Sequence, residues 1–469
     1  MKYVSTRGDA PTLGFADVLL AGLATDGGLY VPASWPVLSP ETIRGFAGRP
    51  YADVAYEVLK PFVGDEIAPT ALRAMIHEAY ATFRHPAVAP LVQIDDRHFV
   101  LELFHGPTLA FKDVAMQLLS RLMDHVLRER SRRATIVGAT SGDTGGAAIA
   151  AFGGSERCDV FILFPKDRVS PVQQRQMTTF GSASVHPIAV EGTFDDCQAI
   201  VKAMFNDASF RAETALSGVN SINWARIMAQ IVYYFTSAAT LGAPDRPVSF
   251  TVPTGNFGDV FAGYAAKRMG LPIERLIIAT NENDILERTM RTGRYEMNGV
   301  QATMSPSMDI EISSNFERLL FEAGGRDADN VVRMMQTLQQ SRAFTVPPEA
   351  IEMIRAEFDA GRTDEAATAD VIRRTLESTS YLLDPHTAVG VGVAEARLGL
   401  EPMITLGTAH PAKFPASVEK ACGIHPPLPT NHTDLMERPE QFETVANDVA
   451  HVQDFIRSRS RAVRLGAAA

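Results

Sequence analysis

The feature that most limits the fold of this chain is a series of short apolar, β-branched runs that alternate with helix-like stretches. The runs lie at residues 134–138, 159–164, 248–252, 276–279 and 403–406. Continuous apolar strands that alternate with helices are typical of mostly parallel sheets covered by helices on both faces. The pattern therefore predicts an α/β protein, whose ligands we expect in a crevice at the carboxyl ends of the strands.

The length of the chain predicts more than one packed unit, because 469 residues exceed what one hydrophobic core usually organises. The first stretch is rich in helix and lacks the strand–turn–helix rhythm, so we expect an N-terminal domain at 1–95. We expect a smaller α/β domain at 96–240, a larger α/β domain at 241–430, and a C-terminal helix with a tail at 431–469.

Composition excludes several classes of partner. The chain has 44 Lys and Arg against 55 Asp and Glu, a net charge of −11, which argues against nucleic acid or an anionic membrane as the main partner. The widely separated Cys158, Cys197 and Cys422 form neither a disulfide framework nor a metal motif, so we expect no metal and a reducing cytoplasm. The charge-free run at 227–242 is too short and too polar for a membrane span, which predicts a buried helix.

Lysine is rare in this chain: only eight of the 44 basic residues are lysines. A lysine in an apolar stretch is therefore a candidate for amine chemistry, which arginine cannot supply. Lys112 follows Leu-Ala-Phe and opens an apolar helix, where burial and the helix dipole lower the pKa of an amine. Such an amine suits a Schiff base. The alternative is a surface lysine paired with Asp113.

Two glycine-rich turns follow predicted strands, at 139–146 (ATSGDTGG) and 253–259 (PTGNFGD). Their exposed amides and hydroxyls are suited to holding a carboxylate or a phosphate. The first turn is neither a Walker A loop nor a nucleophile elbow, and a tight structural turn is its alternative. Neither turn has the pattern of a nicotinamide-binding loop. Together with a buried lysine, the two turns predict a ligand pair that carries at least two anionic groups.

Two further polar clusters lie beside predicted helices. Residues 220–226 (NSINWAR) place amide, hydroxyl and guanidinium donors ahead of the buried helix, a set able to grip a phosphate. The alternative is a helix N-cap followed by a surface arginine. Residues 406–414 (LGTAHPAKF) follow the last strand, where polar groups converge on the crevice. Their alternative is the start of a helix that binds no ligand.

These motifs together resemble the threonine synthase family, which are fold-type II enzymes that use pyridoxal 5′-phosphate and share the fold of tryptophan synthase β. The resemblance extends over nearly the whole chain and is to the longer bacterial and fungal subgroup. The matching segments are 3–8, 26–32, 105–113, 140–145, 220–226, 255–259, 305–310 and 408–414. It implies an α/β fold of mostly parallel sheets covered by helices, with an N-terminal helix-rich domain.

The resemblance also implies an activity and a set of site residues. The activity is that of a lyase in amino-acid biosynthesis, which converts O-phospho-L-homoserine and water into L-threonine and phosphate. Lys112 would form the Schiff base with pyridoxal phosphate and later transfer protons. The residues implied for the cofactor are Lys112, Gly255, Asn256, Phe257, Gly258, Asp259, Thr408 and Asp143. Those implied for the substrate are Thr140, Ser141, Thr144, Asn220, Ser221, Arg226 and Lys413.

Asp143 departs from the pattern of related lyases, in which an asparagine at this place donates to the 3′-oxygen of the cofactor. A carboxylate cannot donate, so Asp143 must be protonated or turned away to fit the site. Two alternatives to the activity stay open: another fold-type II lyase, such as a serine or threonine dehydratase, and a catalytically silent protein that binds pyridoxal phosphate. The resemblance favours a monomer over a homodimer.

Overall fold

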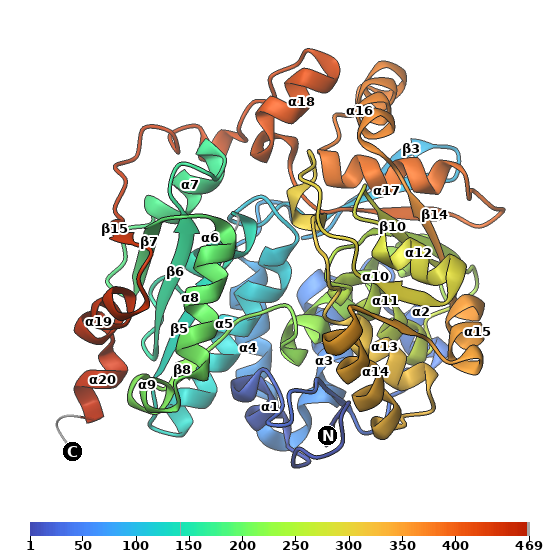
Figure 1. The fold of residues 1–469 in the computed structure, drawn as a ribbon. Helices are drawn as coiled ribbons and strands as arrows, with labels where there is room; N and C mark the ends of the chain where they lie inside the picture. Colours follow the sequence, from blue (N-terminus) through green and yellow to red (C-terminus); the bar gives the residue numbers. More distant parts are fainter. Residues whose placement is uncertain (141, 467–469) are drawn as a thin grey trace.

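The computed structural model describes residues 1–140 and 142–466, and two separate sheets dominate it (Figure 1). The smaller sheet has five strands in the order β15-β7-β6-β5-β8, and every pairing in it is parallel. Its strands are β5 (Ala134–Ala139), β6 (Cys158–Pro165), β7 (Val185–Glu191), β8 (Leu216–Ser217) and β15 (Glu443–Ala446).

The larger sheet has six strands in the order β13-β10-β9-β14-β4-β3. All of its pairings are parallel except the hairpin that β3 forms with β4. Its strands are β3 (Leu91–Asp95), β4 (His98–Glu102), β9 (Val248–Pro253), β10 (Ile273–Thr280), β13 (Phe358–Arg362) and β14 (Met403–Gly407). The prediction of an α/β protein with mostly parallel sheets is therefore confirmed.

The apolar runs in the sequence became strands because helices remove both of their faces from water. All eight residues of β6 are buried, and β6 contacts α6 (Asp143–Phe152) and α8 (Phe194–Asn206). All six residues of β9 are likewise buried, between α11 (Gly258–Arg268) and α17 (Pro385–Glu395). Such strands have no face that needs polar side chains, so their sequences are continuously apolar.

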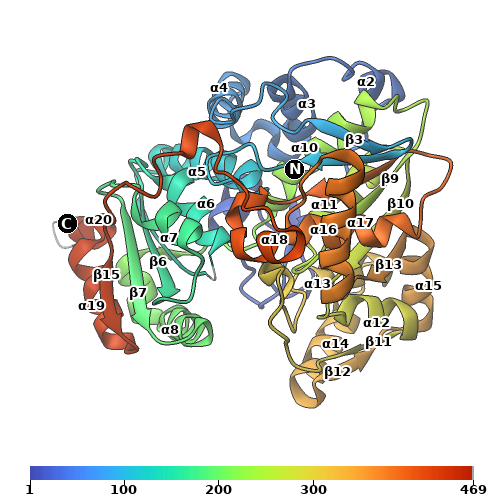
Figure 2. The same ribbon diagram turned by 90° about the horizontal axis from the view of Figure 1, so that it is seen from above.

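Helices of the N-terminal part pack against two long helices that lie between the sheets (Figure 2). The long helices are α5 (Lys112–Glu129) and α10 (Trp224–Thr240). Helix α10 is buried along almost its whole length, which confirms the buried helix expected near residues 227–242. The N-terminal elements are β1 (Tyr3–Ser5), α1 (Phe15–Ala21), β2 (Tyr30–Pro32), α2 (Pro40–Arg44), α3 (Tyr51–Val63), η1 (Gly64–Glu66) and α4 (Pro69–Tyr80).

The remaining elements cover the sheets and build the C-terminal part. They are α7 (Pro171–Thr178), α9 (Ala208–Thr214), α12 (Ile285–Thr292), β11 (Arg294–Glu296), η2 (Pro306–Met308), α13 (Phe316–Ala323), α14 (Ala328–Ser341), β12 (Ala343–Thr345), α15 (Pro348–Glu357), α16 (Glu365–Thr379), η3 (Pro411–Lys413), α18 (Pro415–Cys422), η4 (Thr430–His432), α19 (Val449–Arg459) and α20 (Arg461–Gly466). Within the described ranges, no helix combines the length and the apolar character that crossing a membrane requires.

Strand pairing connects segments across the expected domain boundaries. Strand β4 falls in the range 96–240, yet it pairs in the larger sheet beside β14. Strand β15 falls in the C-terminal range 431–469 and pairs with β7 at the edge of the smaller sheet. The four-part division of the chain stays a prediction.

Candidate functional site

A cavity of about 1140 Å³ opens where the strands of both sheets end. Its wall includes Ala139 at the end of β5, Pro253 at the end of β9 and Thr408 directly after β14. The carboxyl ends of parallel strands are where α/β proteins usually bind ligands, so the place of this cavity agrees with the sequence-based expectation. The cavity also reaches Phe194 at the start of α8, and Val300 and Ile312.

Lys112 lies in this cavity as the first residue of α5, with a side chain that is almost entirely buried. Its position is set by main-chain contacts before the helix, since the Phe111 N–H donates to the Thr408 carbonyl oxygen at 2.8 Å. Burial lowers the pKa of the Lys112 amine, and the positive charges of Lys413 and Arg226 lower it further, against the opposing effect of Asp143. An amine in this state is suited to nucleophilic attack on an aldehyde.

Asp113 does not pair with Lys112, so the surface ion pair weighed from the sequence is absent within the described chain. The Asp113 carboxyl instead accepts the Thr108 N–H and the Thr108 hydroxyl, each at 2.7 Å, and is fully buried. Burial raises its pKa to about 6. Gly106 makes room for this carboxyl, since a Cβ there would come within 2.5 Å of the Asp113 Cβ. Asp113 thus shapes the turn that precedes Lys112.

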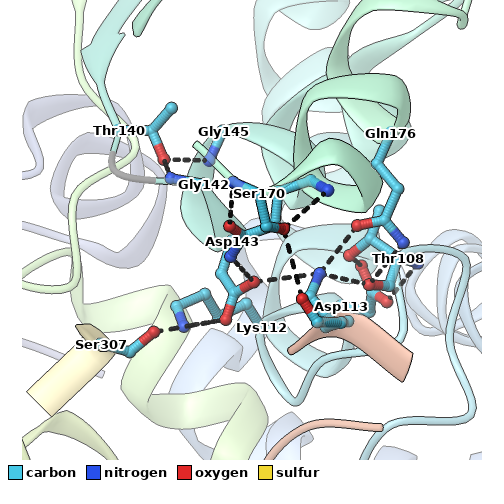
Figure 3. Close-up of polar contacts among 12 residues, drawn as sticks. Thr108, Lys112, Asp113, Thr140, Gly142, Asp143, Gly145, Ser170, Gln176 and Ser307 are labelled. Atoms are coloured by element: carbon cyan, nitrogen blue, oxygen red, sulfur yellow. Dashed lines mark hydrogen bonds and ion pairs between the residues drawn. The ribbon is translucent and has the colours of Figure 1, made fainter. Parts of the chain in front are cut away.

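The first glycine-rich turn wraps around the Thr140 hydroxyl, which accepts from the Gly142 N–H at 2.9 Å and from the Gly145 N–H at 3.0 Å (Figure 3). Gly145 has to be a glycine, because a Cβ there would lie 2.4 Å from the Thr140 Cγ2. Thr140 and Thr144 both line the cavity. Ser141, also expected to bind substrate, lies outside the described residues.

Asp143 begins α6 and lies beside Lys112. Its Oδ1 accepts from the Gln173 amide at 2.9 Å and lies 3.0 Å from the Lys413 Nζ. Its Oδ2 lies 3.5 Å from the Lys112 Nζ and 3.3 Å from the Ser307 hydroxyl. The positive charges of Lys413 and Lys112 outweigh burial and hold the pKa of Asp143 far below its ordinary value. Asp143 is therefore an ionised acceptor, which does not match the donor role of the asparagine in related lyases.

The second glycine-rich turn lies at the N-terminus of α11 and lines the same cavity with residues 253–259. Phe257 adopts a left-handed backbone with φ +64°, which turns the chain into the helix. The turn is fastened from outside, because the Ser313 hydroxyl donates to the Gly255 carbonyl oxygen at 2.6 Å and the Asn315 amide donates to the Asn256 carbonyl oxygen at 2.8 Å. A helix N-terminus in a glycine-rich turn provides free N–H groups for an anion.

Asp259 ends this turn and is buried beneath it. Its Oδ1 accepts from the hydroxyls of Tyr233 and Tyr234 on α10, and its Oδ2 has no partner within the described residues. Burial raises the pKa of Asp259 to about 7, while the two tyrosine hydroxyls and Lys112 oppose the rise. The unpartnered oxygen belongs to a residue of the cavity wall.

Arg226 is buried in the wall of the cavity, contrary to the alternative of a surface arginine. Its Nη1 donates to the Val219 carbonyl oxygen at 3.0 Å, its Nε has no partner, and no ion pair joins it to a carboxylate in the described parts of the chain. Burial lowers its pKa to about 10. Asn220 and Ser221 line the cavity beside it, and the N-cap of α10 is Asn223. A buried guanidinium with free donors is a site for an anion.

The segment after β14 holds two of the expected site residues, Thr408 and Lys413, which lie in different surroundings. Thr408 lines the cavity, and its buried hydroxyl has no partner in the described part of the chain. The Lys413 side chain is fully buried behind the cavity wall, where its amine donates to the Thr108 carbonyl oxygen at 2.7 Å and the Gln176 Oε1 at 2.8 Å. The substrate contact expected for Lys413 stays a prediction.

Among the cavity residues that were not expected as site residues from the sequence are three polar ones, Gln230, Ser307 and His386. Gln230 has a buried Oε1 without a partner in the described ranges and follows Arg226 by one helical turn, so helical spacing could have identified it. The His386 Nε2 accepts from the Ser307 N–H at 3.1 Å, while its Nδ1 lies 2.9 Å from the Asp384 Oδ1. No pattern in the sequence links Ser307 to His386, because they are brought together only by folding.

Comparison with known families identifies three matches that together cover nearly the whole chain. The model of the threonine synthase N terminus matches residues 2–80, and the model of the threonine synthase C-terminal region matches residues 387–456. The model of pyridoxal-phosphate-dependent enzymes matches residues 81–403, and so overlaps the C-terminal model at residues 387–403.

Individual relatives agree with these matches. A threonine synthase of Pseudomonas aeruginosa is 53% identical over 97% of this chain and 98% of its own length. The solved structure of a pyridoxal-phosphate-bound threonine synthase from Brucella melitensis is 63% identical, with a TM-score of 0.97 over 98% of this chain and 100% of that one. A yeast threonine synthase structure is 41% identical, with a TM-score of 0.93 over 98% of both chains. The chain therefore belongs to the threonine synthase family of pyridoxal-phosphate-dependent enzymes.

Proposed function

We propose that this protein converts O-phospho-L-homoserine and water into L-threonine and phosphate. The observation that supports this most strongly is that the buried amine of Lys112 and the buried guanidinium of Arg226, which has no carboxylate partner in the described chain, line one cavity. The amine suits an aldehyde cofactor, and the guanidinium suits the phosphate ester of the substrate. The names of the family's relatives support the same assignment.

Pyridoxal phosphate fits the residues of the cavity. The Thr408 hydroxyl is buried without a partner in the described chain, as expected of a group whose hydrogen-bond partner is a ligand atom. At Gly255 a Cβ would fill the space before the Ser307 carbonyl oxygen, so only glycine leaves this loop open. Lys112 would hold the aldehyde carbon, the N–H groups of residues 255–259 the phosphate, and Thr408 the pyridine nitrogen.

Each residue of the site has a task in this reaction. When bound, the cofactor supplies an electron-accepting ring that makes the Cα proton of an amino acid removable. The Lys112 amine, with its lowered pKa, would take a proton from Cα and then one from Cβ, so that the Cβ–H electrons form a Cβ–Cγ double bond as phosphate leaves Cγ. It would then return protons at Cγ and at Cα, and water would add its hydroxyl at Cβ. Arg226, together with Asn220 and Ser221, would hold the phosphate group as negative charge develops on it and it leaves Cγ. The Thr140 and Thr144 hydroxyls, at the N-terminus of α6, would orient the substrate carboxylate.

The proposal includes a cytoplasmic monomer divided into four parts at residues 95, 240 and 430. The free thiols of Cys158, Cys197 and Cys422 support the part of the proposal that places the protein in a reducing compartment.

The test compares the wild-type protein with Lys112→Ala and with Lys420→Ala, an exposed lysine of α18 that serves as the matched control. We expect the wild type and the control to show a visible absorbance band with pyridoxal phosphate and to release phosphate and threonine from O-phospho-L-homoserine. Lys112→Ala should lose the band and the turnover. A band without phosphate release would contradict the substrate assignment and favour a dehydratase-like lyase. No band in the wild type would contradict the cofactor assignment.

A further inference from the structure

The second buried lysine beside the site, Lys413, uses all of its donors on the protein itself. It is the last residue of η3 and is 0% exposed. Its amine meets the Thr108 carbonyl oxygen at 2.7 Å, the Gln176 Oε1 at 2.8 Å and the Asp143 Oδ1 at 3.0 Å. An ammonium group has three N–H donors, so none is left for a ligand.

Asp143 is shared between two lysines, and its contact with Lys413 is the shorter one. The Asp143 Oδ1 lies 3.0 Å from the Lys413 Nζ and also accepts from Gln173, whereas Oδ2 lies 3.5 Å from the Lys112 Nζ. Figure 3 shows Ser307 and Lys112 approaching the same carboxylate oxygen. One negative charge thus faces two amines that are both buried.

Whether the Asp143 carboxylate pairs with one lysine or with two affects the protonation state of the Lys112 amine. A buried carboxylate beside a single lysine stabilises the ammonium form, which has no lone pair for nucleophilic attack. A second lysine on the far oxygen weakens this effect, because it holds the carboxylate in place and adds a positive charge that opposes protonation of the first.

We propose that Lys413 is a positioning residue that holds Asp143 out of a tight ion pair with Lys112 and thereby keeps the Lys112 amine able to lose its proton. The inference rests on the proposed function, in which the uncharged Lys112 amine reacts with the cofactor. It also accounts for the ionised Asp143 at a place where related lyases have a neutral asparagine.

The other charged groups around Lys112 do not change this assignment. Arg226 on α10 adds a further positive charge that lowers the pKa of Lys112. Asp259 on α11 also interacts with Lys112, but burial raises its pKa to about 7, so it carries less negative charge than Asp143 at neutral pH. His386 on α17 acts on Asp143 and favours its ionised form. The Asp143 carboxylate therefore has the main influence on the protonation of Lys112, and Lys413 fixes the position of that carboxylate.

The test measures the protonation of Lys112 directly. Full-length protein freed of pyridoxal phosphate is labelled with trace acetic anhydride across neutral to alkaline pH, and mass spectrometry follows the peptide that carries Lys112. In Lys413→Met the labelling midpoint should move to higher pH, since Asp143 then pairs with Lys112 alone. In Asp143→Asn it should move to lower pH. The double variant, which replaces the ion pair by two neutral side chains, should lie between them.

A second substitution protects the test against misfolding. If Lys413→Met does not fold, as judged by its thermal unfolding curve, Lys413→Gln takes its place, since an uncharged amide can still donate to the Thr108 carbonyl oxygen while Asp143 stays intact. The midpoint should again be higher than in the wild type. An unchanged midpoint in these comparisons, or one moved the opposite way, overturns the inference. Weakened phosphate binding in Lys413→Met with an unmoved midpoint would overturn it in favour of a substrate contact.

The readout needs neither cofactor nor turnover. A protein that fails to act on O-phospho-L-homoserine can still show the predicted order of midpoints, and an active protein can fail to show it. Failure of this inference is therefore distinguishable from failure of the proposed function.

Discussion

Gly255 lies so close to the backbone of Ser307 that a Cβ on Gly255 would stand 2.8 Å from the Ser307 carbonyl oxygen. The contact joins the loop after β9 to the turn η2, two segments that both line the cavity. Because the opposing atom belongs to the backbone, it cannot move aside as a flexible side chain would.

Gly255→Ala should therefore weaken the binding of pyridoxal phosphate, since either the loop or η2 must shift to admit the new methyl group. The measurement is a titration of the visible absorbance with the cofactor. Gly138→Ala on β5 is the control, because its methyl group would meet the Ile162 Cδ1 at an ordinary 3.5 Å. Equal affinities for the two variants would contradict the assignment of this loop to the cofactor.

Thr408→Val should leave the stability of the cofactor-free protein unchanged or slightly higher, because the hydroxyl it removes is buried without a partner in the described chain. It should lower the affinity for pyridoxal phosphate. Thr405→Val is the matched control on the same segment, since the Thr405 hydroxyl lies 2.7 Å from the His98 Nε2 in the core. The control should lose about 1–3 kcal/mol of unfolding free energy, as measured by urea unfolding. A loss of stability in Thr408→Val as large as in the control would argue for a structural hydroxyl.

Arg226→Met should lower kcat/KM for O-phospho-L-homoserine by roughly 10- to 100-fold, because charge-assisted hydrogen bonds are worth about 1.5–3 kcal/mol. It should not lower the unfolding temperature, since the variant no longer buries a charge without a carboxylate partner. With pyridoxal phosphate bound, so that the N–H groups of residues 255–259 are occupied, inorganic phosphate should raise the unfolding temperature of the wild type and not that of the variant.

Arg318→Met is the matched control for this comparison. Arg318 is also fully buried, but it donates to the carbonyl oxygens of Tyr30 and Ile222. The control should lose stability and keep its response to phosphate. If Arg226→Met still responds to phosphate, the anion site is elsewhere.

Asp259→Asn should change how stability depends on pH. The pKa of Asp259 is raised to about 7 from an ordinary 3.8, so the folded chain holds this proton more tightly than the unfolded chain. The stabilisation is complete below pH 3.8 and is lost as the pH rises to about 7. The neutral variant lacks this term, so its stability relative to the wild type should rise over the same interval. Urea unfolding of both proteins across that interval measures the difference, and parallel curves would contradict the raised pKa.

Much of the fold follows from local pattern. The apolar runs near residues 134 and 248 became β5 and β9, and the charge-free run near 227 became α10. These elements were predictable because burial on all sides requires continuously apolar sequence. The pairing of β15 with β7, which lie about 250 positions apart in the chain, was not predictable, because an edge strand of four residues carries almost no periodic signal.

The candidate site divides in the same way. From the sequence alone, Lys112, the two glycine-rich turns and Arg226 could be predicted as site residues. An amine in an apolar stretch and glycines after strands are local features that can be read from neighbouring residues. The sequence could not show that Asp143 is ionised between two lysines, or that His386 meets Ser307. Those facts depend on which charges and donors face each other across segments far apart in the chain. Only the tertiary structure decides that, since burial sets the energy of each charge and folding alone supplies its partners.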